Sequence, residues 1–291
     1  MIFYVDFRIS SLLILYSMQQ ILKKTALGGL RFILARRRLY RLNRLLFHLS
    51  LHGMGIANYE NSRVSGESYL MARLGRNQRK LIVLDIGANI GTFSVELRKT
   101  SPLATIYAFE PHKKTFQSLQ TAAQEYGFEA INAGCGKTMG TASLFDYAGK
   151  KDGSEHATIY RDVIEQIHSA TATSHEIEIT TIDFFMTERK LPQIDFLKID
   201  TEGNELNVLL GAERAIADGR VKAIQFEFNA MNVHSRTFFR DFYVLLAEYR
   251  LYRMLPDGFA PMGSYYPAAF EIFAFQNILA LHTTCDLFAC P

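Results

Sequence analysis

The residues best suited to chemistry follow an apolar run early in the chain. Leu81–Leu84 leads into Asp85, after which come Gly87, Asn89 and Gly91. A buried strand that passes through a glycine turn into a helix is where α/β sheets bind nucleotide-like ligands. Glycines at such a turn let the backbone approach a ligand closely, because they lack a Cβ atom. The spacing matches neither the G-x-G-x-x-G of dinucleotide-binding domains nor a phosphate-binding G-K-[ST] loop.

A second acid follows the next apolar run at a distance that suits ribose recognition. The run Thr105–Phe109 ends at Glu110, about 19 residues after Gly91, and an acid there can accept hydrogen bonds from both ribose hydroxyls of an adenosine. If the adenosine carries a methionine, Asp85 can reach the amino group of that methionine, and Asn89 can cap the next helix or bond the methionine portion of the ligand. A ribose without a pyrophosphate fits S-adenosylmethionine (SAM), which is the cofactor that we expect.

A second group of acids follows the apolar run Phe196–Ile199. Asp200 ends this run, and Glu202 and Glu205 lie where a helix is predicted to start. Acids in a first helical turn are favoured by the helix dipole, so both glutamates can also be explained as capping residues. Asp200 is our first candidate for a base that takes a hydroxyl proton, Glu202 is the second, and His234 is the third.

A lysine inside the same run needs a charged partner. Lys198 lies between apolar residues of a predicted buried strand, and Asp200 and Glu227 are the acids available to pair with it. Glu227 and Asn229 share a strand face and, with Asp200, offer oxygen ligands of the kind that Mg²⁺ prefers. Carboxylates at strand ends are common without a metal, and the histidines form no metal-binding pair, so we expect no metal.

Apolar runs alternate with helix-compatible segments along the chain, as in a parallel sheet with crossover helices. We predict strands at 81–86, 104–109, 129–134, 194–200 and 221–228. We predict helices near 91–100, 112–126, 203–218 and 235–249. Two later β-rich runs, 249–254 and 271–279, would close the edge of the sheet. The predicted fold class is α/β, with a seven-stranded, mostly parallel, Rossmann-like sheet and an N-terminal helical extension.

A long insert, 135–193, separates the third and fourth predicted strands. Its segments Thr141–Tyr147 and His175–Thr181 alternate apolar and polar residues, which predicts a hairpin. The polar segment 148–173 between them has the length and composition of a lid or substrate loop.

The extension at the N-terminus is basic, whereas the rest of the chain is mildly acidic. Residues 1–60 hold nine lysines and arginines against two acids, and the whole chain has a net charge of +3. Between Arg36 and Leu51, leucines share one helical face and arginines another. This pattern is explained by a helix packed on the domain with a solvated arginine face, by docking of 30–50 on an anionic membrane, or by nucleic-acid binding. We expect no nucleic-acid partner.

The domain organisation and the cellular compartment follow from composition. Residues 1–22 are apolar but interrupted by polar side chains, so we expect neither a membrane span nor a secretory signal. The three cysteines lack a pairing pattern and metal-ligand spacing, which suits a reducing cytoplasm. We expect a cytoplasmic protein, peripheral at the membrane through 30–50, with an extension over 1–75, a catalytic domain over 76–281 and a tail over 282–291.

The motifs together resemble the FkbM-type SAM-dependent methyltransferases. The matching segments are VLDIGANIGTFS (83–94), YAFEPHKKTFQSL (107–119), TIDFF (181–185), IDFLKIDTEGNELNVLLGA (194–212) and IQFEFN (224–229). This resemblance implies a seven-stranded SAM-binding sheet and O-methylation of a hydroxyl on a sugar, glycan or secondary metabolite. It also implies cofactor contacts by Asp85, Gly87, Asn89, Gly91 and Glu110.

Two other functions remain as alternatives. A nucleic-acid methyltransferase would carry [DNS]-P-P-[YFW] where this chain reads Asp200–Gly203, or a Pro-Cys nucleophile, which the chain lacks. A non-catalytic binding or scaffold protein would not need Asp85, Gly87, Gly91 and Glu110 intact. A measurement of SAM affinity would separate the second alternative from an enzyme.

Overall fold

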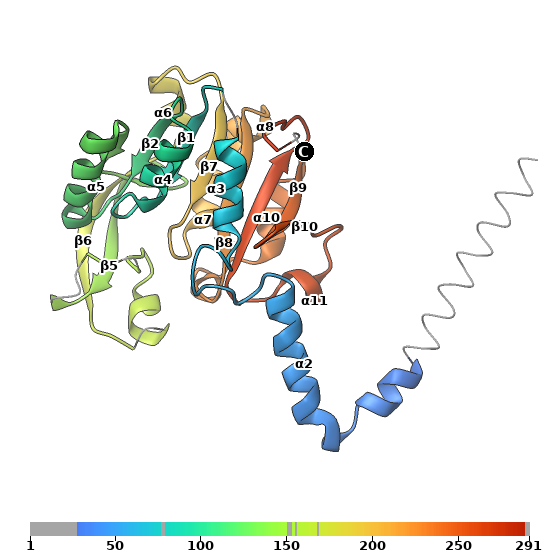
Figure 1. Ribbon diagram of the computed structural model, residues 1–291. Coiled ribbons are helices and arrows are strands. Elements are labelled where there is room, and N and C mark those ends of the chain that lie inside the picture. The colour runs from blue at the N-terminus through green and yellow to red at the C-terminus, as the bar shows by residue number, and fades with distance from the viewer. Residues whose placement is uncertain (1–27, 77–78, 150–152, 155, 168, 289–291) are drawn as a thin grey trace, which may run out of the picture. The chain divides into compact units, whose positions relative to one another are not determined.

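The computed structural model describes residues 28–288 except 77–78, 150–152, 155 and 168 (Figure 1). Contacts between residues divide the chain into two units, Met1–Gly53 and Met54–Pro291. The sequence analysis placed this boundary after residue 75. The structure assigns α3 (Glu67–Gly75) to the larger unit, because Leu70 and Leu74 pack in the same apolar cluster as Val83 of the sheet.

An eight-stranded sheet forms the centre of the larger unit, in the order β10-β9-β11-β8-β7-β1-β2-β3 (Figure 1). Its strands are β1 (Ile82–Ile86), β2 (Thr105–Phe109), β3 (Glu129–Ile131), β7 (Ile194–Ile199), β8 (Val221–Phe228), β9 (Tyr249–Leu255), β10 (Gly258–Pro261) and β11 (Gln276–His282). Parallel pairing joins the neighbours β3, β2, β1, β7 and β8, in that order. β11 runs antiparallel to both β8 and β9. The predicted α/β, mostly parallel, Rossmann-like fold is therefore confirmed.

The sheet has one strand more than predicted. After β9 the chain turns at Pro256 and Asp257, and Gly258 then pairs with Leu255 to begin the antiparallel strand β10. The sequence Pro-Asp-Gly between two apolar runs is a local signal for such a turn. The predicted strand over 249–254 ends before this turn, so the prediction did not include the hairpin of β9 and β10.

Alternate residues of β1 face two apolar clusters, which is why the sheet has helices on both faces. Leu84 and Ile86 belong to one cluster, and Leu81 and Val83 belong to the other. The helices that follow α3 are α4 (Thr92–Thr100), α5 (Lys113–Tyr126), α6 (Ile182–Glu188), α7 (Glu205–Leu210), α8 (Glu213–Ala217), α9 (Met231–His234), α10 (Phe239–Leu245) and α11 (Pro267–Phe270).

One helix that was predicted as continuous is divided, since the predicted helix near 203–218 becomes α7 and α8. The helix predicted near 235–249 is observed as the shorter α10, and α9 lies before it. Between α7 and α8 the carbonyl of Gly211 accepts a hydrogen bond from the amide of Asp183, at 2.9 Å. This tertiary contact uses a carbonyl that a continuous helix would need for its own ladder.

The insert between β3 and β7 forms a second sheet, with strands in the order β4-β6-β5. β5 (Gly140–Tyr147) pairs antiparallel with β6 (Ala172–Thr180), which confirms the predicted hairpin, and β4 (Gly134–Cys135) adds to β6 in parallel. A single π-helical turn, Val163–Ile167, lies in the segment that joins β5 to β6.

The smaller unit is helical in its described part, 28–53. Residues 28–34 are helical, a 3₁₀ turn η1 (Arg37–Leu39) follows, and α2 (Tyr40–Gly53) completes the unit. The helix is interrupted at residues 35–36. The side-chain amide of Asn43 donates to the carbonyl of Leu34, just before this interruption, at 2.8 Å. The amphipathic helix expected between Arg36 and Leu51 is therefore observed as η1 and α2, and the segment 30–50 is not one continuous helix. The expectation for residues 1–22 lies outside the described part of the chain. No helix among the described residues is long and apolar enough to cross a membrane.

Candidate active site

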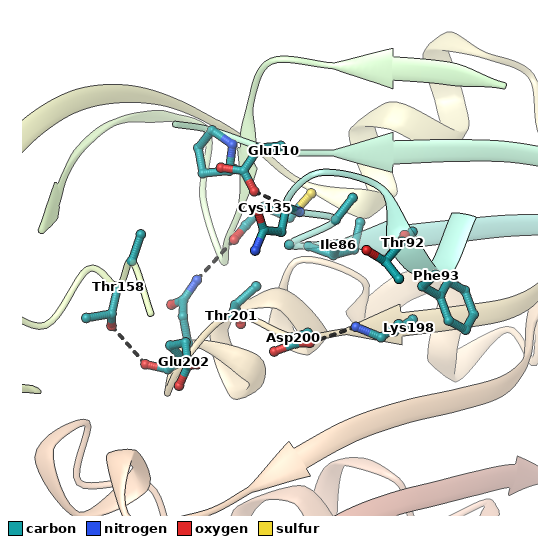
Figure 2. A pocket seen from close by; sticks show the side chains of 18 of the residues that line it. Ile86, Thr92, Phe93, Glu110, Cys135, Thr158, Lys198, Asp200, Thr201 and Glu202 are labelled. Carbon is teal, nitrogen blue, oxygen red and sulfur yellow. Dashed lines mark hydrogen bonds and ion pairs between the residues drawn. The ribbon is translucent and has the colours of Figure 1, made fainter. Parts of the chain in front are cut away.

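The carboxyl ends of β1, β2 and β7 bring three of the predicted acids to one edge of the large sheet. Asp85, Glu110 and Asp200 all line a cavity of about 400 Å³ at this edge. Figure 2 labels Glu110 and Asp200 among the residues of its wall. Strand ends on either side of a crossover point form such a crevice in open α/β sheets. The prediction that the ends of the first and fourth strands flank one crevice is thus met.

The turn after β1 needs glycine for a reason that the sequence did not reveal. Gly87 has a φ of 79°, and a Cβ atom placed on it would lie 1.8 Å from the carbonyl oxygen of Asp200. Gly91 has a φ of 90°, and its Cβ would lie 2.8 Å from a methyl of Leu119. Both glycines were predicted to let a ligand approach, but the atom that requires glycine at Gly87 belongs to the protein, and Gly91 is required by its left-handed backbone. Gly87 lines the cavity and Gly91 does not.

Asp85 is a buried carboxylate with one oxygen, here called open, that has no hydrogen-bond partner among the described residues. Its side chain is 0% exposed, and Oδ2 accepts a hydrogen bond of 2.7 Å from Ser94. Oδ1 is buried without a hydrogen-bond partner among the described residues. Burial raises the pKa of Asp85, although Lys198 and Ser94 act in the opposite direction. A buried acceptor without a partner is costly, so Asp85 is suited to a ligand that brings a donor.

Glu110 is held at the end of β2 by backbone amides. Its Oε2 accepts from the amide of Asn89 at 3.0 Å, and its Oε1 accepts from the amide of His112 at 2.8 Å. Asn89 adopts a left-handed conformation, with a φ of 50°, and lines the cavity beside Glu110. Burial raises the pKa of Glu110 to about 7, with the two amides lowering it and the charges of Asp85 and Asp146 raising it further.

Lys198 pairs with Asp200, one of the two partners that the sequence offered. The Nζ atom lies 2.8 Å from Oδ2 of Asp200, and both residues line the cavity (Figure 2). The ammonium also lies 5.6 Å from the centre of the Phe93 ring. Burial alone lowers the pKa of Lys198, but the carboxylates of Asp200, Asp85 and Glu67 outweigh it, so the pKa is raised. The lysine is therefore a fixed positive charge in the cavity wall.

Glu202 lies beside the segment that was predicted to be a lid. Its carbonyl accepts from the hydroxyl of Thr158 at 2.8 Å, and its Oε1 lies 3.4 Å from Nδ1 of His156. Ser154 and Ile159 from the same segment also line the cavity. The segment 148–173 therefore contributes part of the cavity wall, which is consistent with a role in substrate selection.

Glu205 stabilises the turn after β7 and does not line the cavity. Its Oε1 accepts from the amide of Thr201 at 3.1 Å, from the hydroxyl of Thr201 at 3.2 Å and from the amide of Gly203 at 3.0 Å. Burial raises its pKa to about 7 against these hydrogen bonds. Glu205 lies in the first turn of α7, as the sequence predicted, and its hydrogen bonds hold the turn that precedes the helix.

Glu227 and Asn229, which the sequence offered with Asp200 as oxygen ligands for Mg²⁺, form a hydrogen bond with each other. Asn229 donates to Glu227 at 3.2 Å, and burial, followed by the charges of Asp200 and Glu202, raises the pKa of Glu227 well above its ordinary value. Across the described residues, no group of three or more His, Cys, Asp or Glu side chains has an arrangement that could hold a metal ion. His234, our third candidate base, is not among the residues that line the cavity.

Sequence reasoning missed the apolar wall of the cavity. Leu144, Ile177 and Ile179 of the second sheet, with Cys135 of β4, face the strand ends that carry the acids. Asn204, which follows β7 of the large sheet, links it to the second sheet, since its side-chain amide donates to the carbonyl of Cys135 in β4 at 3.1 Å. The alternation of the hairpin was visible in the sequence, but nothing local indicated which sheet edge its apolar face covers.

Several known proteins that are similar to this chain are named as methyltransferases. The methyltransferase FkbM domain model matches residues 85–254. "Methyltransferase 1" of Beauveria bassiana (strain ARSEF 2860) is 28% identical over 144 residues, which are 45% of this chain and 58% of that protein. The 31-O-demethyl-FK506 methyltransferase FkbM of Streptomyces tacrolimicus is 28% identical over 156 residues, covering 46% of this chain and 60% of that protein. The matches thus span about three fifths of these relatives.

One solved structure that is similar to this chain is the precorrin-6y C5,15-methyltransferase from Geobacter metallireducens GS-15. It is 13% identical, covers 73% of this chain and 87% of its own, and has a TM-score of 0.38.

Proposed function

The chain belongs to the methyltransferase FkbM domain family, and we propose that it uses SAM to methylate a hydroxyl oxygen of a small molecule or glycan. The observation that carries the cofactor assignment is that Oδ1 of Asp85 has no hydrogen-bond partner among the described residues, while Asp85 lines the same cavity as Glu110. When bound, SAM supplies an electrophilic methyl group on a sulfonium, which is a good leaving group.

The residues at the strand ends fit this cofactor. The open oxygen of Asp85 would accept a hydrogen bond from the ammonium of the methionine portion, and Glu110 would accept from the ribose hydroxyls. Leu144, Ile177 and Ile179 would cover the apolar parts of the ligand and keep water away from them. The work of these residues is to align the reacting groups and to exclude water.

Asp200 is suited to take the proton of the acceptor hydroxyl. It lines the cavity at the end of β7, and its ion pair with Lys198 fixes the orientation of its carboxylate. Glu202 lines the cavity too and remains the second candidate, whereas His234 lies away from it. A positioned carboxylate within reach of the hydroxyl is what general-base catalysis requires.

The charge of the cavity wall favours an uncharged acceptor. Glu67, Glu96 and Glu202 line the cavity together with Asp200, against the single ammonium of Lys198. Such a wall repels phosphates, which disfavours nucleic acid as the substrate and favours a neutral hydroxyl compound. The name of the Streptomyces relative, a 31-O-demethyl-FK506 methyltransferase, describes a substrate that lacks a methyl group on oxygen, which supports the same reaction class.

Replacing Asp200 by asparagine should slow methyl transfer roughly 10²- to 10⁴-fold, the range for loss of a general base, while SAM affinity stays unchanged. The substrate is found first by incubating the protein with methyl-labelled SAM and an extract of cell metabolites and glycans, followed by mass spectrometry. Glu202→Gln tests the second candidate, and His234→Asn is the control outside the cavity. Label on nitrogen would contradict O-methylation, and a full rate in Asp200→Asn would reject Asp200 as the base.

The affinity for SAM should rise with pH through the pKa of Glu110, which burial places at about 7. Below that pH the carboxyl binds a proton, and above it the carboxylate is a stronger acceptor for ribose hydroxyls. Glu110→Gln should bind SAM roughly tenfold more weakly at pH 8, equivalent to the loss of one charge-assisted hydrogen bond. Calorimetry at pH 6, 7 and 8 measures both effects, with the exposed cavity residue Glu96→Gln as the control. Parallel pH profiles for wild type and Glu110→Gln would refute the assignment.

A further inference from the structure

The described part of the smaller unit is strongly basic and carries no acid. Residues 28–53 contain six arginines and neither aspartate nor glutamate. These arginines are Arg31, Arg36, Arg37, Arg38, Arg41 and Arg44. Among the ion pairs between described residues, none includes any of the six. The segment therefore presents uncompensated positive charge.

The same segment exposes a continuous row of leucines. Leu42, Leu45, Leu46 and Leu49 of α2 are 46%, 55%, 47% and 57% exposed, and their spacing of three and four residues places them on one helical face. Just before the break in the helix, Phe32 is 72% exposed. An exposed contiguous apolar face on a folded chain marks an interaction surface.

The arrangement of the two residue types points to a lipid surface. At 3.6 residues per turn Arg44 lies on the face opposite the leucines, whereas Arg41, which precedes the first leucine of the row, points to the side of the leucine face. An arginine so placed can lay its apolar stem along the acyl boundary while its guanidinium reaches a lipid phosphate. A nucleic acid would pair with the arginines but would leave the leucines in water.

We propose that residues 28–53 dock on an anionic phospholipid surface, with the leucine face of α2 inserted at the acyl boundary and the arginines bound to headgroup phosphates. This inference is independent of the SAM site. The attraction depends on the negative surface potential of the lipid, so neutral lipid should bind little.

Sedimentation of the full chain with vesicles tests the electrostatic part. The protein should bind vesicles of phosphatidylcholine with 30% phosphatidylglycerol and should remain unbound with phosphatidylcholine alone. Replacing Arg37, Arg38, Arg41 and Arg44 by glutamine should weaken binding on the order of a hundredfold or more. The matched control removes the same charge from exposed arginines of the larger unit. It carries Arg63→Gln, Arg76→Gln, Arg240→Gln and Arg250→Gln and should bind as wild type does.

A tryptophan probe tests insertion, since the chain contains no tryptophan. Leu45→Trp should give blue-shifted fluorescence with anionic vesicles and should be quenched by brominated acyl chains. Val244→Trp, on an exposed position of α10 in the larger unit, should show neither effect. The proposal is overturned if binding ignores lipid charge, if the four-arginine variant binds as well as wild type, or if the probe at 45 escapes quenching. A concentration-dependent blue shift without lipid would overturn it in favour of self-association.

Discussion

Replacing Gly87 by alanine should lower the free energy of unfolding by about 2–5 kcal/mol, from left-handed backbone strain and overpacking together. The new methyl would lie 1.8 Å from the carbonyl oxygen of Asp200, and the φ of 79° is one that residues with a Cβ rarely adopt. Because the clash is with backbone, either the turn after β1 or the turn after β7 must move. Urea denaturation measures the loss, and calorimetry should show SAM binding lost with it.

Gly127 provides a matched control for this substitution. Its φ of 77° is nearly that of Gly87, but a Cβ there would have nothing within 4 Å. Gly127→Ala should therefore lose only the cost of the left-handed conformation, about 1–2 kcal/mol, and should keep SAM affinity. Equal losses for the two variants would show that the contact with Asp200 costs nothing, contrary to our expectation.

Replacing Asp85 by asparagine should weaken SAM binding roughly 10- to 100-fold, which corresponds to about 1.5–3 kcal/mol for a charge-assisted hydrogen bond. Asparagine has nearly the same shape and can still accept the bond from Ser94. Its amide nitrogen, however, would bring a donor to the place where Asp85 now offers an open acceptor. Calorimetry with SAM at fixed pH measures the change.

The fold should tolerate this substitution. Asp85 is fully buried and burial raises its pKa, so a neutral side chain removes a buried charge, while Lys198 keeps its contact with Asp200. Ser94→Ala is the control, because it removes the hydrogen bond to Asp85 but leaves the charge in place. Wild-type SAM affinity in Asp85→Asn would refute the role of Asp85, and unfolding of that variant would refute our account of its burial.

Local sequence patterns were sufficient to predict the parallel part of the fold. The predicted strand over 81–86 is observed as Ile82–Ile86, and that over 221–228 as Val221–Phe228. Apolar β-branched runs next to turn residues specify such strands without reference to the rest of the chain. The hairpin of β5 and β6 was predictable in the same way, from the alternation of its side chains.

The acids at one sheet edge were also predictable, because the carboxyl ends of parallel strands meet there whatever the details of packing. Asp85, Glu110 and Asp200 needed only the positions of three strands and the order in which they pair. The candidate base His234 did not follow this rule. It lies beyond β8 in the short helix α9, and the cavity does not extend to it.

Other features depended on contacts between segments far apart in the sequence. Gly87 is required by the carbonyl of Asp200, and the break after α7 occurs where the Gly211 carbonyl bonds the Asp183 amide. The apolar wall from Leu144 to Ile179 faces the acids only because the second sheet lies across the strand ends. The sequence by itself determined the parallel strands and the acids at the edge of their sheet, since these follow from local periodicity. Only the tertiary structure decided the wall, the glycine contacts and the open oxygen of Asp85, because each depends on which distant atoms occupy the neighbouring space.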